Sequence, residues 1–253
     1  MPCITWPGDF DRNNPRLSWR EMPVLVPILQ SLRLFDTLAP EQLAALSPTL
    51  TERVVERREV VIKRGQVDAG LGFLIQGRLQ SVDFTLDGRE VGLHFVNNGD
   101  FFGELSVIDR QPAAEYVIAV APSRVVFFDQ ERAHALMFST AAAAQAVARR
   151  MADRMRQATR QRALLALPSS FQRVCAQLIL MTRPGRSGVL VVEMPPTHQE
   201  IAIMVNTSRE TVTRALQFLQ GLSVVAREGN QLVVHLPDTL QQAADGKVAP
   251  VKG

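Results

Sequence analysis

The stretch from Thr197 to Leu222 constrains the fold of this chain more than any other, because it carries closely spaced start and stop signals. Pro195 and Pro196 end the preceding segment, since proline lacks the backbone N–H that a continuing helix or strand needs. Thr197 and Glu200 then form an S/T-x-x-E capping box, which predicts the first turn of a helix. A new helical unit therefore begins at this point.

The apolar pattern that follows predicts two short helices. The first has a buried stripe formed by Ile201, Ala202, Met204 and Val205. Asn206 comes where the chain must reverse, and asparagine is one of the few non-glycine residues that tolerate the left-handed conformation of a tight turn. Ser208 then caps a second amphipathic helix, whose buried face consists of Val212, Ala215, Leu216 and Leu219. Two helices joined by such a turn make a helix-turn-helix.

The second helix leaves polar side chains exposed near its N-terminal end, namely Arg209, Glu210, Thr213 and Arg214. A recognition helix meets base edges in the major groove at these positions, and arginine with guanine is the commonest specific contact. After Gly221, the runs Ser223 to Ala226 and Gln231 to Leu236 flank a turn at residues 227–230, which predicts a hairpin. Helix, turn, helix and hairpin together describe a winged helix.

The string Ser208-Arg209-Glu210-Thr211-Val212-Thr213-Arg214 is similar to the recognition-helix signature of the CRP/FNR family, the bacterial transcription regulators related to the cyclic AMP receptor protein. The resemblance implies a homodimer on palindromic double-stranded DNA, with half-sites similar to TGTGA and RNA polymerase as a partner. It also implies that Arg209 and Arg214 read guanines and that Glu210 accepts from a cytosine amino group. The other DNA contacts that we predict are Thr197, Gln199, Ser208, Thr211 and Thr213.

Several properties of the whole chain limit its class. With 253 residues it is long enough for two domains. No apolar run approaches the roughly 20 residues that span a bilayer, and the N-terminus lacks a signal-peptide pattern, so we expect a cytoplasmic protein without membrane contact. The net charge of +3 suits a polyanionic partner without requiring one. Cys3 and Cys175 lie outside any metal-ligand spacing, so we expect no disulfide, no metal site and no iron–sulfur cluster.

We predict that the chain is not an enzyme. It has no nucleophile–base pair, no G-x-x-x-x-G-K-[ST] loop and no H-E-x-x-H string. The alternative from another class is a cyclic-nucleotide-binding module without DNA readout. Binding of DNA by the part that starts at about residue 168 would distinguish the two hypotheses.

The region from Thr51 to Phe128 changes to a β-type period. Its short runs are separated by glycine turns at spacings typical of an antiparallel barrel or jelly roll; the runs are Val54 to Ile62, Leu71 to Ile75, Leu79 to Phe84, Glu90 to Val96 and Arg124 to Phe128. The segments 72–79 and 99–105 are similar to cyclic nucleotide-binding β-rolls. The predicted fold is therefore α+β, with an N-terminal β-roll, a long dimerisation helix and a C-terminal winged helix-turn-helix. His94, alone on its strand, is interpreted as a structural residue.

In these β-rolls the positions of Gly103, Glu104 and Leu105 form a phosphate-binding cassette, which requires an arginine and a serine about ten residues later. Ala113 and Ala114 stand at those places, and the next residue is Glu115, which would repel an anion. Loss of such a buried charge-assisted pair costs on the order of 2 to 5 kcal/mol of binding free energy. We therefore predict that cAMP does not bind in the usual pose.

Residues 141–167 predict one long helix without proline or glycine. Ala144, Met151, Ala158 and Leu165 recur every seven residues, with Val147, Ala148 and Met155 beside them, which is the pattern of a two-stranded coiled coil. The alternative is a helix packed on its own barrel. The helix also carries an arginine run, consisting of Arg149, Arg150, Arg154, Arg156, Arg160 and Arg162, which is either a solvated face or a replacement anion site.

The resemblance favours an effector other than cAMP. Some relatives are thought to sense cyclic di-GMP, and Arg154 and Arg156 are the candidate contacts for it. Where cAMP-binding relatives use a Thr-Ser pair against adenine, this chain has Ala158 and Thr159, so only half of that contact is present. A regulator that needs no ligand remains a further alternative.

The expected domain limits follow the proline and glycine breaks. We expect a flexible tail over residues 1–22, a sensor domain over 23–137 and a dimerisation helix over 138–167. The DNA-binding domain should cover 168–240, with Ser169 and Gln172 as a second capping box at its start. Beyond Pro237 the chain shows no clear pattern, and residues 241–253 are expected to be a flexible tail.

Overall fold

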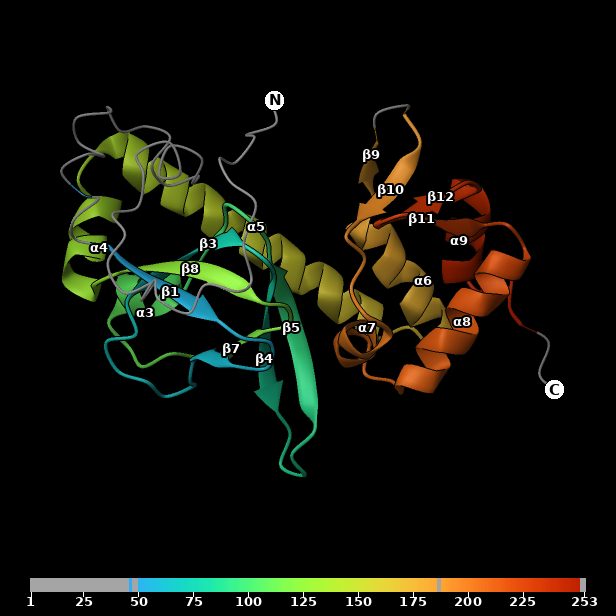
Figure 1. Cartoon of the computed structure of the whole chain (residues 1–253), viewed down its shortest axis with the longest axis horizontal. Coiled ribbons are helices and arrows are strands. Elements are labelled where there is room, and N and C mark those ends of the chain that lie inside the picture. The colour runs from blue at the N-terminus through green and yellow to red at the C-terminus, as the bar shows by residue number, and fades with distance from the viewer. Residues whose placement is uncertain (1–45, 47–49, 186–187, 251–253) are drawn as a thin grey trace, which may run out of the picture.

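The computed structural model describes residue 46 and residues 50–185 and 188–250. The tail predicted over residues 1–22 and most of the helical segment predicted from Met22 to Leu50 lie outside the described residues. Within them the chain forms two domains bridged by one long helix (Figure 1). The α+β architecture predicted from the sequence is confirmed.

The N-terminal domain is a β-roll of two antiparallel four-stranded sheets. One sheet has the order β1 (Thr51–Val55), β8 (Ser123–Phe128), β3 (Leu71–Gln76) and β6 (Phe101–Phe102). The other has the order β2 (Val60–Ile62), β7 (Tyr116–Ala119), β4 (Leu79–Phe84) and β5 (Glu90–Val96). Four of the five β runs predicted from the sequence correspond to β3, β4, β5 and β8. The run predicted from Val54 to Ile62 is divided by a turn into the end of β1 and β2, and β6 and β7 were not predicted.

The aromatic side chains of the roll form much of its core. Phe73, Phe102 and Phe128 are at most 1 % exposed, and full burial of one such ring contributes about 1.5 to 3 kcal/mol. Gly77 turns the chain between β3 and β4 with a φ of 102°. A Cβ at this position would lie 2.2 Å from the Ser123 hydroxyl, so the close approach of two segments requires glycine.

Two short helices flank the roll. Helix α3 (Glu104–Asp109) follows Gly103 directly, and α4 (Gln130–Met137) is capped by Asp129. The long helix α5 (Ala141–Leu165) begins with Thr140 as its N-cap and ends two residues earlier than predicted. It runs from the β-roll to the C-terminal domain (Figure 1). Among the described residues, no helix combines the length and the apolar character needed to cross a membrane.

The C-terminal domain packs helices around a small sheet. Its elements are α6 (Ser170–Met181), β9 (Arg183–Pro184), β10 (Leu190–Glu193), α7 (His198–Met204), α8 (Arg209–Gly221), β11 (Val225–Glu228), β12 (Gln231–Val234) and α9 (Pro237–Ala244). The strands are ordered β11-β12-β10-β9, and β11 and β12 form the predicted hairpin around Gly229 and Asn230. The predicted capping box of Ser169 and Gln172 starts α6.

The prediction of a flexible tail from residue 241 is wrong for its first part. Residues 237–244 form α9, with Pro237 in its first turn. Leu240, Ala243 and Ala244 are at most 5 % exposed and belong to the core of the C-terminal domain. The Gln172 side-chain amide donates to the Ala244 carbonyl at 3.3 Å. Packing against α6, which a single short segment does not reveal, stabilises this helix.

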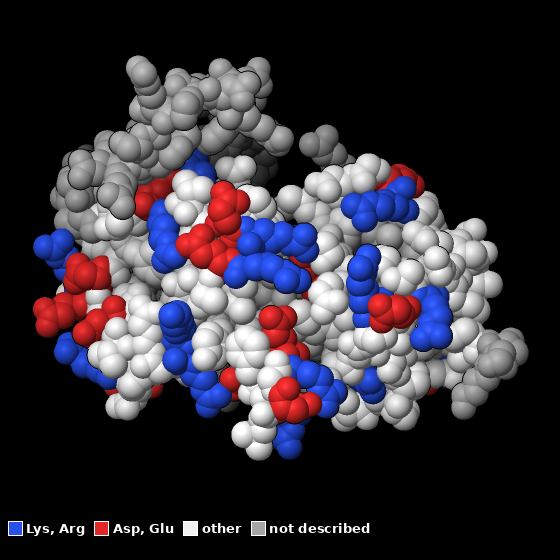
Figure 2. Space-filling view, turned by 60° about the horizontal axis from the view of Figure 1, so that its bottom comes forward, with Lys and Arg blue, Asp and Glu red and all other residues white. Residues whose placement is uncertain are grey.

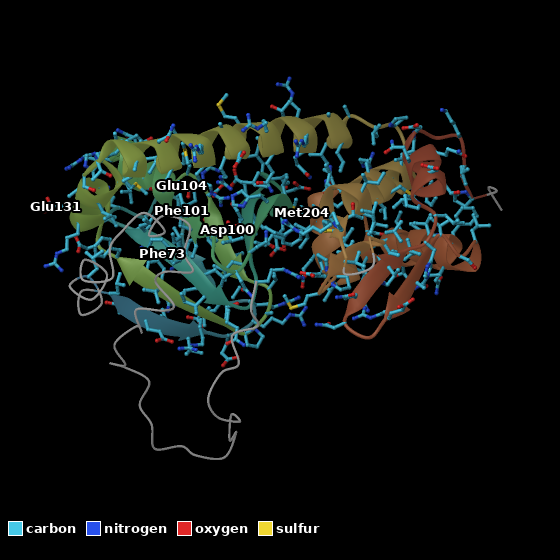
Figure 3. All side chains as sticks on the ribbon, turned by 90° about the horizontal axis from the view of Figure 1, so that it is seen from above. Phe73, Asp100, Phe101, Glu104, Glu131 and Met204 are labelled. Carbon is cyan, nitrogen blue, oxygen red and sulfur yellow. The ribbon has the colours of Figure 1, made fainter. Side chains whose placement is uncertain are left out.

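The two domains contact each other through α7. This helix lies beside β5 (Figure 1), and Met204, labelled in Figure 3, stands at the junction. The Gln161 amide on α5 donates to the Met204 carbonyl at 2.6 Å. Arg78 of the roll lies 3.9 Å from Glu200 of α7. The helix-turn-helix is therefore fixed against the sensor domain of its own chain.

Candidate functional site

Side-chain caps set the geometry of α7 and α8. The Thr197 hydroxyl accepts from the Glu200 N–H at 3.3 Å, and the Glu200 carboxylate accepts from the Thr197 N–H at 3.1 Å. Asn206 has a φ of 48°, the left-handed conformation expected for the turn. The Ser208 hydroxyl accepts from the Thr211 N–H at 3.2 Å. All three local predictions for the helix-turn-helix are confirmed.

One face of α8 is buried and the opposite face is exposed. Val212, Ala215, Leu216 and Leu219 are between 0 and 7 % exposed. Arg209, Glu210 and Arg214 are exposed and, with Thr213, line an open hollow. Figure 2, in which this side of the molecule is turned forward, shows basic side chains next to an acidic one on the C-terminal domain. The side chains that the sequence predicts as base contacts therefore lie on the surface.

The charge of Glu210 suits it to accept hydrogen bonds. Its own backbone N–H, the Ser208 hydroxyl and the neighbouring Arg209 and Arg214 lower the pKa of this carboxyl below its ordinary value. The side chain is therefore ionised at neutral pH and acts only as an acceptor. Such a group matches the amino group of cytosine, and each arginine matches the two acceptors of guanine.

Of the remaining predicted contacts, Thr213 lines the hollow, whereas the other four lie elsewhere on the helix-turn-helix. Thr197, Gln199 and Ser208 are exposed, and Thr211 and Thr213 are half-buried. The Thr213 hydroxyl donates to the Arg209 carbonyl at 3.0 Å. His198 was not predicted from the sequence, and its Nδ1 lies 2.8 Å from that same hydroxyl. The contact joins α7 to α8 across the turn, and no local pattern indicates it.

The predicted cassette of the sensor domain forms around Gly103. This residue has a φ of 78°, and a Cβ on it would lie 2.8 Å from the Gly70 carbonyl oxygen. Glu104 begins α3 and is 1 % exposed. Residues 103–105 and 113–115 line a cavity of about 10 Å³, which is room for about one water molecule. The structure thus brings the five cassette positions and Glu115 together around a space too small for a nucleotide.

Arg154 of α5 is paired with both carboxylates of this region. Its Nε lies 3.2 Å from Oε1 of Glu104, and its Nη2 lies 3.0 Å from Oε1 of Glu115. Figure 3 shows Glu104 beneath α5, with Asp100 and Phe101 nearby. On the same helix Arg150 lies 3.6 Å from Asp100. Two arginines therefore hold α5 against its own roll, and Glu115 contributes to this network.

His94 is buried in the same network. Its Nε2 lies 3.1 Å from Oε1 of Glu115, and the side chain is 8 % exposed. Burial, with Arg154 and Arg150 nearby, holds the pKa of His94 well below its ordinary value. Burial also raises the pKa of Glu104, which Arg154 partly offsets. The two groups are thus placed where burial disfavours their charged forms.

The other predicted ligand contacts on α5 lie outside the cavity. Thr159 is exposed, and its hydroxyl donates to the Met155 carbonyl at 2.9 Å. Arg156 is exposed and pairs with Asp153 at 3.0 Å. Of the three α5 residues predicted at the ligand, the structure brings Arg154 alone to the cassette. Among residues 46, 50–185 and 188–250, no cluster of His, Cys, Asp or Glu is arranged to hold a metal ion.

The long helix divides its apolar residues between two directions. Ala143 and Val147 are at most 4 % exposed, and Val147 packs in the core of the roll. Ala148 and Ala158 are exposed, and Met155 is 74 % exposed. The helix thus packs on its own barrel, as the alternative prediction had it, while leaving an apolar strip uncovered in this chain.

Comparisons with known proteins agree with the division of the chain into two domains. Residues 52–140 match the cyclic nucleotide-binding domain, and residues 172–243 match the Crp-like helix-turn-helix domain. A CRP-like cAMP-activated global transcriptional regulator of Mycobacterium tuberculosis is 28 % identical over 220 residues, which cover 86 % of this chain and 98 % of the relative.

Solved structures show the same fold. FixK2 of Bradyrhizobium japonicum superposes with a TM-score of 0.65 at 21 % identity, covering 80 % of this chain and 99 % of that one. The cyclic di-GMP-responsive global regulator CLP of Xanthomonas campestris has a TM-score of 0.57 at 22 % identity, covering 74 % and 94 % of the two chains.

Proposed function

The chain belongs to the CRP/FNR family of transcription regulators, and we propose that it acts as a homodimer on palindromic DNA. The observation that carries the proposal is the exposed set Arg209, Glu210 and Arg214 at the start of α8. In the proposed complex each recognition helix enters a major groove, and the two half-sites lie about one helical turn apart. Arg209 and Arg214 read guanines, and Glu210 accepts from cytosine, in a half-site similar to TGTGA.

The Arg209→Ala variant tests this assignment in a gel shift. Loss of one arginine–guanine contact should cost about 1 to 3 kcal/mol and relax preference at one base pair. Arg132→Ala, which changes an exposed arginine on α4, is the matched control and should bind as the wild type does. Uniform weakening of Arg209→Ala on all DNA sequences would contradict direct readout.

The homodimer is supported by the uncovered apolar strip of α5. Met155 is 74 % exposed, and the small residues Ala148 and Ala158 on the same helix permit close approach of a second helix. Pairing of two α5 helices would bring two recognition helices onto one DNA duplex. Met155→Glu should shift the protein toward monomers in sedimentation experiments. An unchanged dimer would place the interface elsewhere.

We propose that cAMP is not the effector. Ala113 and Ala114 supply no charge for a cyclic phosphate, and Glu115 adds a negative one. The cavity at the cassette measures about 10 Å³. Arg154 is paired with Glu104 and Glu115, two carboxylates that line this cavity. These contacts favour an effector that binds outside the cassette cavity, or a regulator that needs no effector.

Cyclic di-GMP is the effector that we favour. The structural relative CLP is described as responsive to it. Arg149, Arg160 and Arg162 are exposed on α5 and form no ion pair with another described residue, so they are available to two phosphates outside the cavity. The rival proposal is a regulator without a ligand, which the paired state of Arg154 supports. RNA polymerase is the proposed partner in transcription.

Calorimetry of the purified protein against cAMP, cGMP and cyclic di-GMP separates these proposals. Heat with cyclic di-GMP alone would support the favoured effector. Absence of heat with all three would support the ligand-independent regulator. Tight binding of cAMP would overturn our interpretation of Ala113 and Ala114.

A further inference from the structure

His198 occupies a position between the two helices of the helix-turn-helix. It is the first residue of α7 and is half-buried. Its Nδ1 lies 2.8 Å from Oγ1 of Thr213, which is on α8. The same oxygen lies 3.0 Å from the Arg209 carbonyl oxygen. One hydroxyl thus contacts a ring nitrogen and a backbone carbonyl at the same time.

This arrangement favours one tautomer of His198. A hydroxyl has a single hydrogen to donate, and a carbonyl oxygen can only accept. With the Thr213 hydroxyl donating to the Arg209 carbonyl, its oxygen accepts from Nδ1 of His198. The imidazole proton lies on Nδ1, and Nε2 carries the lone pair. Nε2 is thus the atom of His198 at which a proton is gained or lost.

The charged neighbours of His198 are all positive. Among the described residues, those that act on the imidazole are Arg209 of α8 and Arg227 of β11. Burial and these two cations lower the pKa of His198 below its ordinary value, so the free protein holds the ring neutral at pH 7.

We propose that His198 binds a backbone phosphate of DNA and takes up one proton at Nε2 when the phosphate arrives. The inference rests on the proposed function, because it places α8 in the major groove, where the preceding helix crosses the sugar–phosphate backbone. A phosphate beside His198 offsets the repulsion that Arg209 and Arg227 exert on the charged form of the imidazole. The neutral Nε2 would present a lone pair to the phosphate oxygen, whereas the protonated Nε2 donates an N–H to it. The proton comes from solvent, and no covalent bond changes.

The proposed proton uptake makes the DNA affinity of the protein depend on pH. The complex holds one more proton per protomer than the free protein, so DNA affinity must rise as the pH falls. One proton changes affinity by at most about tenfold per pH unit, and the two protons of a dimer change it by at most about 100-fold. The rise stops where free His198 is itself protonated.

Fluorescence anisotropy of the full chain between pH 6 and 8.5, at fixed ionic strength, measures this dependence. Both a palindrome with TGTGA half-sites and a DNA of mixed sequence are used, because a phosphate contact is independent of sequence. Affinity for both should increase toward low pH. Calorimetry in buffers of different ionisation enthalpy should count up to one proton taken up per protomer.

Two variants at the same position make the test specific. For His198→Gln, the pH dependence of DNA affinity that this site contributes should be absent. This variant should also bind DNA more weakly than the wild type at pH 6. His198→Arg, which carries a permanent charge, should bind tightly at every pH with the same flat profile. His134→Gln, on α4 of the sensor domain, is the matched histidine control and should keep the wild-type slope.

The outcomes separate this inference from the proposed function. Specific binding of the palindrome with a flat profile, or a full slope in His198→Gln, would overturn the role of His198 alone. Absence of binding to either DNA at every pH would overturn the DNA-binding function as well. Recovery of low-pH affinity in His198→Arg, without its slope, would support a phosphate contact over a purely structural role.

Discussion

The pocket at Gly103 and the exposed face of α8 combine the same kinds of side chain with opposite results. In the pocket, Arg154 is paired with Glu104 and Glu115 at 3.2 and 3.0 Å, and all three side chains are at most 17 % exposed. On α8, Glu210 lies near Arg209 and Arg214, and all three are exposed. The buried charges are satisfied within the chain, whereas the exposed ones are available to a partner.

The difference between the two regions arises from the solvation of their charged side chains. A buried charge that loses its partner remains desolvated and uncompensated, so its pairing is essential to the fold. An exposed charge is solvated with or without a partner, so it contributes little to stability and can be used for recognition. The predictions below separate these two roles by measuring stability and DNA binding in the same variants.

Arg154→Ala should lower the free energy of unfolding by about 3 to 5 kcal/mol, because it leaves two buried carboxylates without their cation. Urea denaturation measures the change. Arg160→Ala, at an exposed position on the same helix, should stay within about 0.5 kcal/mol of the wild type. Equal stability of the two variants would show that the pocket network is not structurally required.

Arg214→Ala should have the reverse profile. We expect the free energy of unfolding to change by less than about 0.5 kcal/mol, since the side chain is exposed. Binding to the palindrome should weaken by about 1 to 3 kcal/mol, because one base contact is lost. Urea denaturation and a gel shift on one preparation measure both. A large loss of stability would remove the contrast between the two regions.

His94 should make the stability of the protein depend on pH. Its pKa is lowered in the folded state, so below pH 6.5 the unfolded state binds more protons than the folded one. Stability is therefore complete above about pH 6.5 and falls as the pH decreases, by at most about 1.4 kcal/mol per pH unit for one proton. Glu115, Arg154 and Arg150 are the charged groups that face the ring.

His94→Gln should reduce the loss of stability at low pH, measured by urea denaturation between pH 5 and 7. His235→Gln, at an exposed histidine, should leave this loss unchanged. An identical pH profile for His94→Gln and the wild type would show that the ring is not held neutral by its surroundings.

Ser208→Ala should have the most modest consequence. The variant loses the N-cap of α8, whose hydroxyl accepts from the Thr211 N–H, and should be destabilised by about 1 kcal/mol. Ser208→Gly should cost only a few tenths of a kcal/mol. Urea denaturation distinguishes the two. Similar losses in both variants would indicate that Ser208 acts through something other than capping.

Features coded by neighbouring residues could be predicted from the sequence. The capping boxes at Thr197 and Ser169, and the turn at Asn206, depend on residues within four positions of one another. The presence of Ala113 and Ala114, at the places where the resembled β-rolls have an arginine and a serine, could also be seen from the sequence. Such patterns depend on local geometry, so they can be interpreted without the tertiary contacts.

Features that depend on packing between distant segments could not be predicted. Arg154 belongs to a run that resembles a solvated face, and its pairing with Glu104 follows only from the way α5 crosses the roll. Helix α9 is short and is stabilised by its contact with α6. The contact of His198 with Thr213 spans the helix-turn-helix and has no sequence signal.

The most direct test of the division between pocket and surface is the dissociation constant of the full-length protein for a palindrome with TGTGA half-sites, measured without and with saturating cAMP. We predict the same constant in both conditions, because the cassette is filled by its own charges while α8 is exposed. A fivefold or larger change on addition of cAMP, which is about the lower end of typical allosteric coupling, would contradict this conclusion.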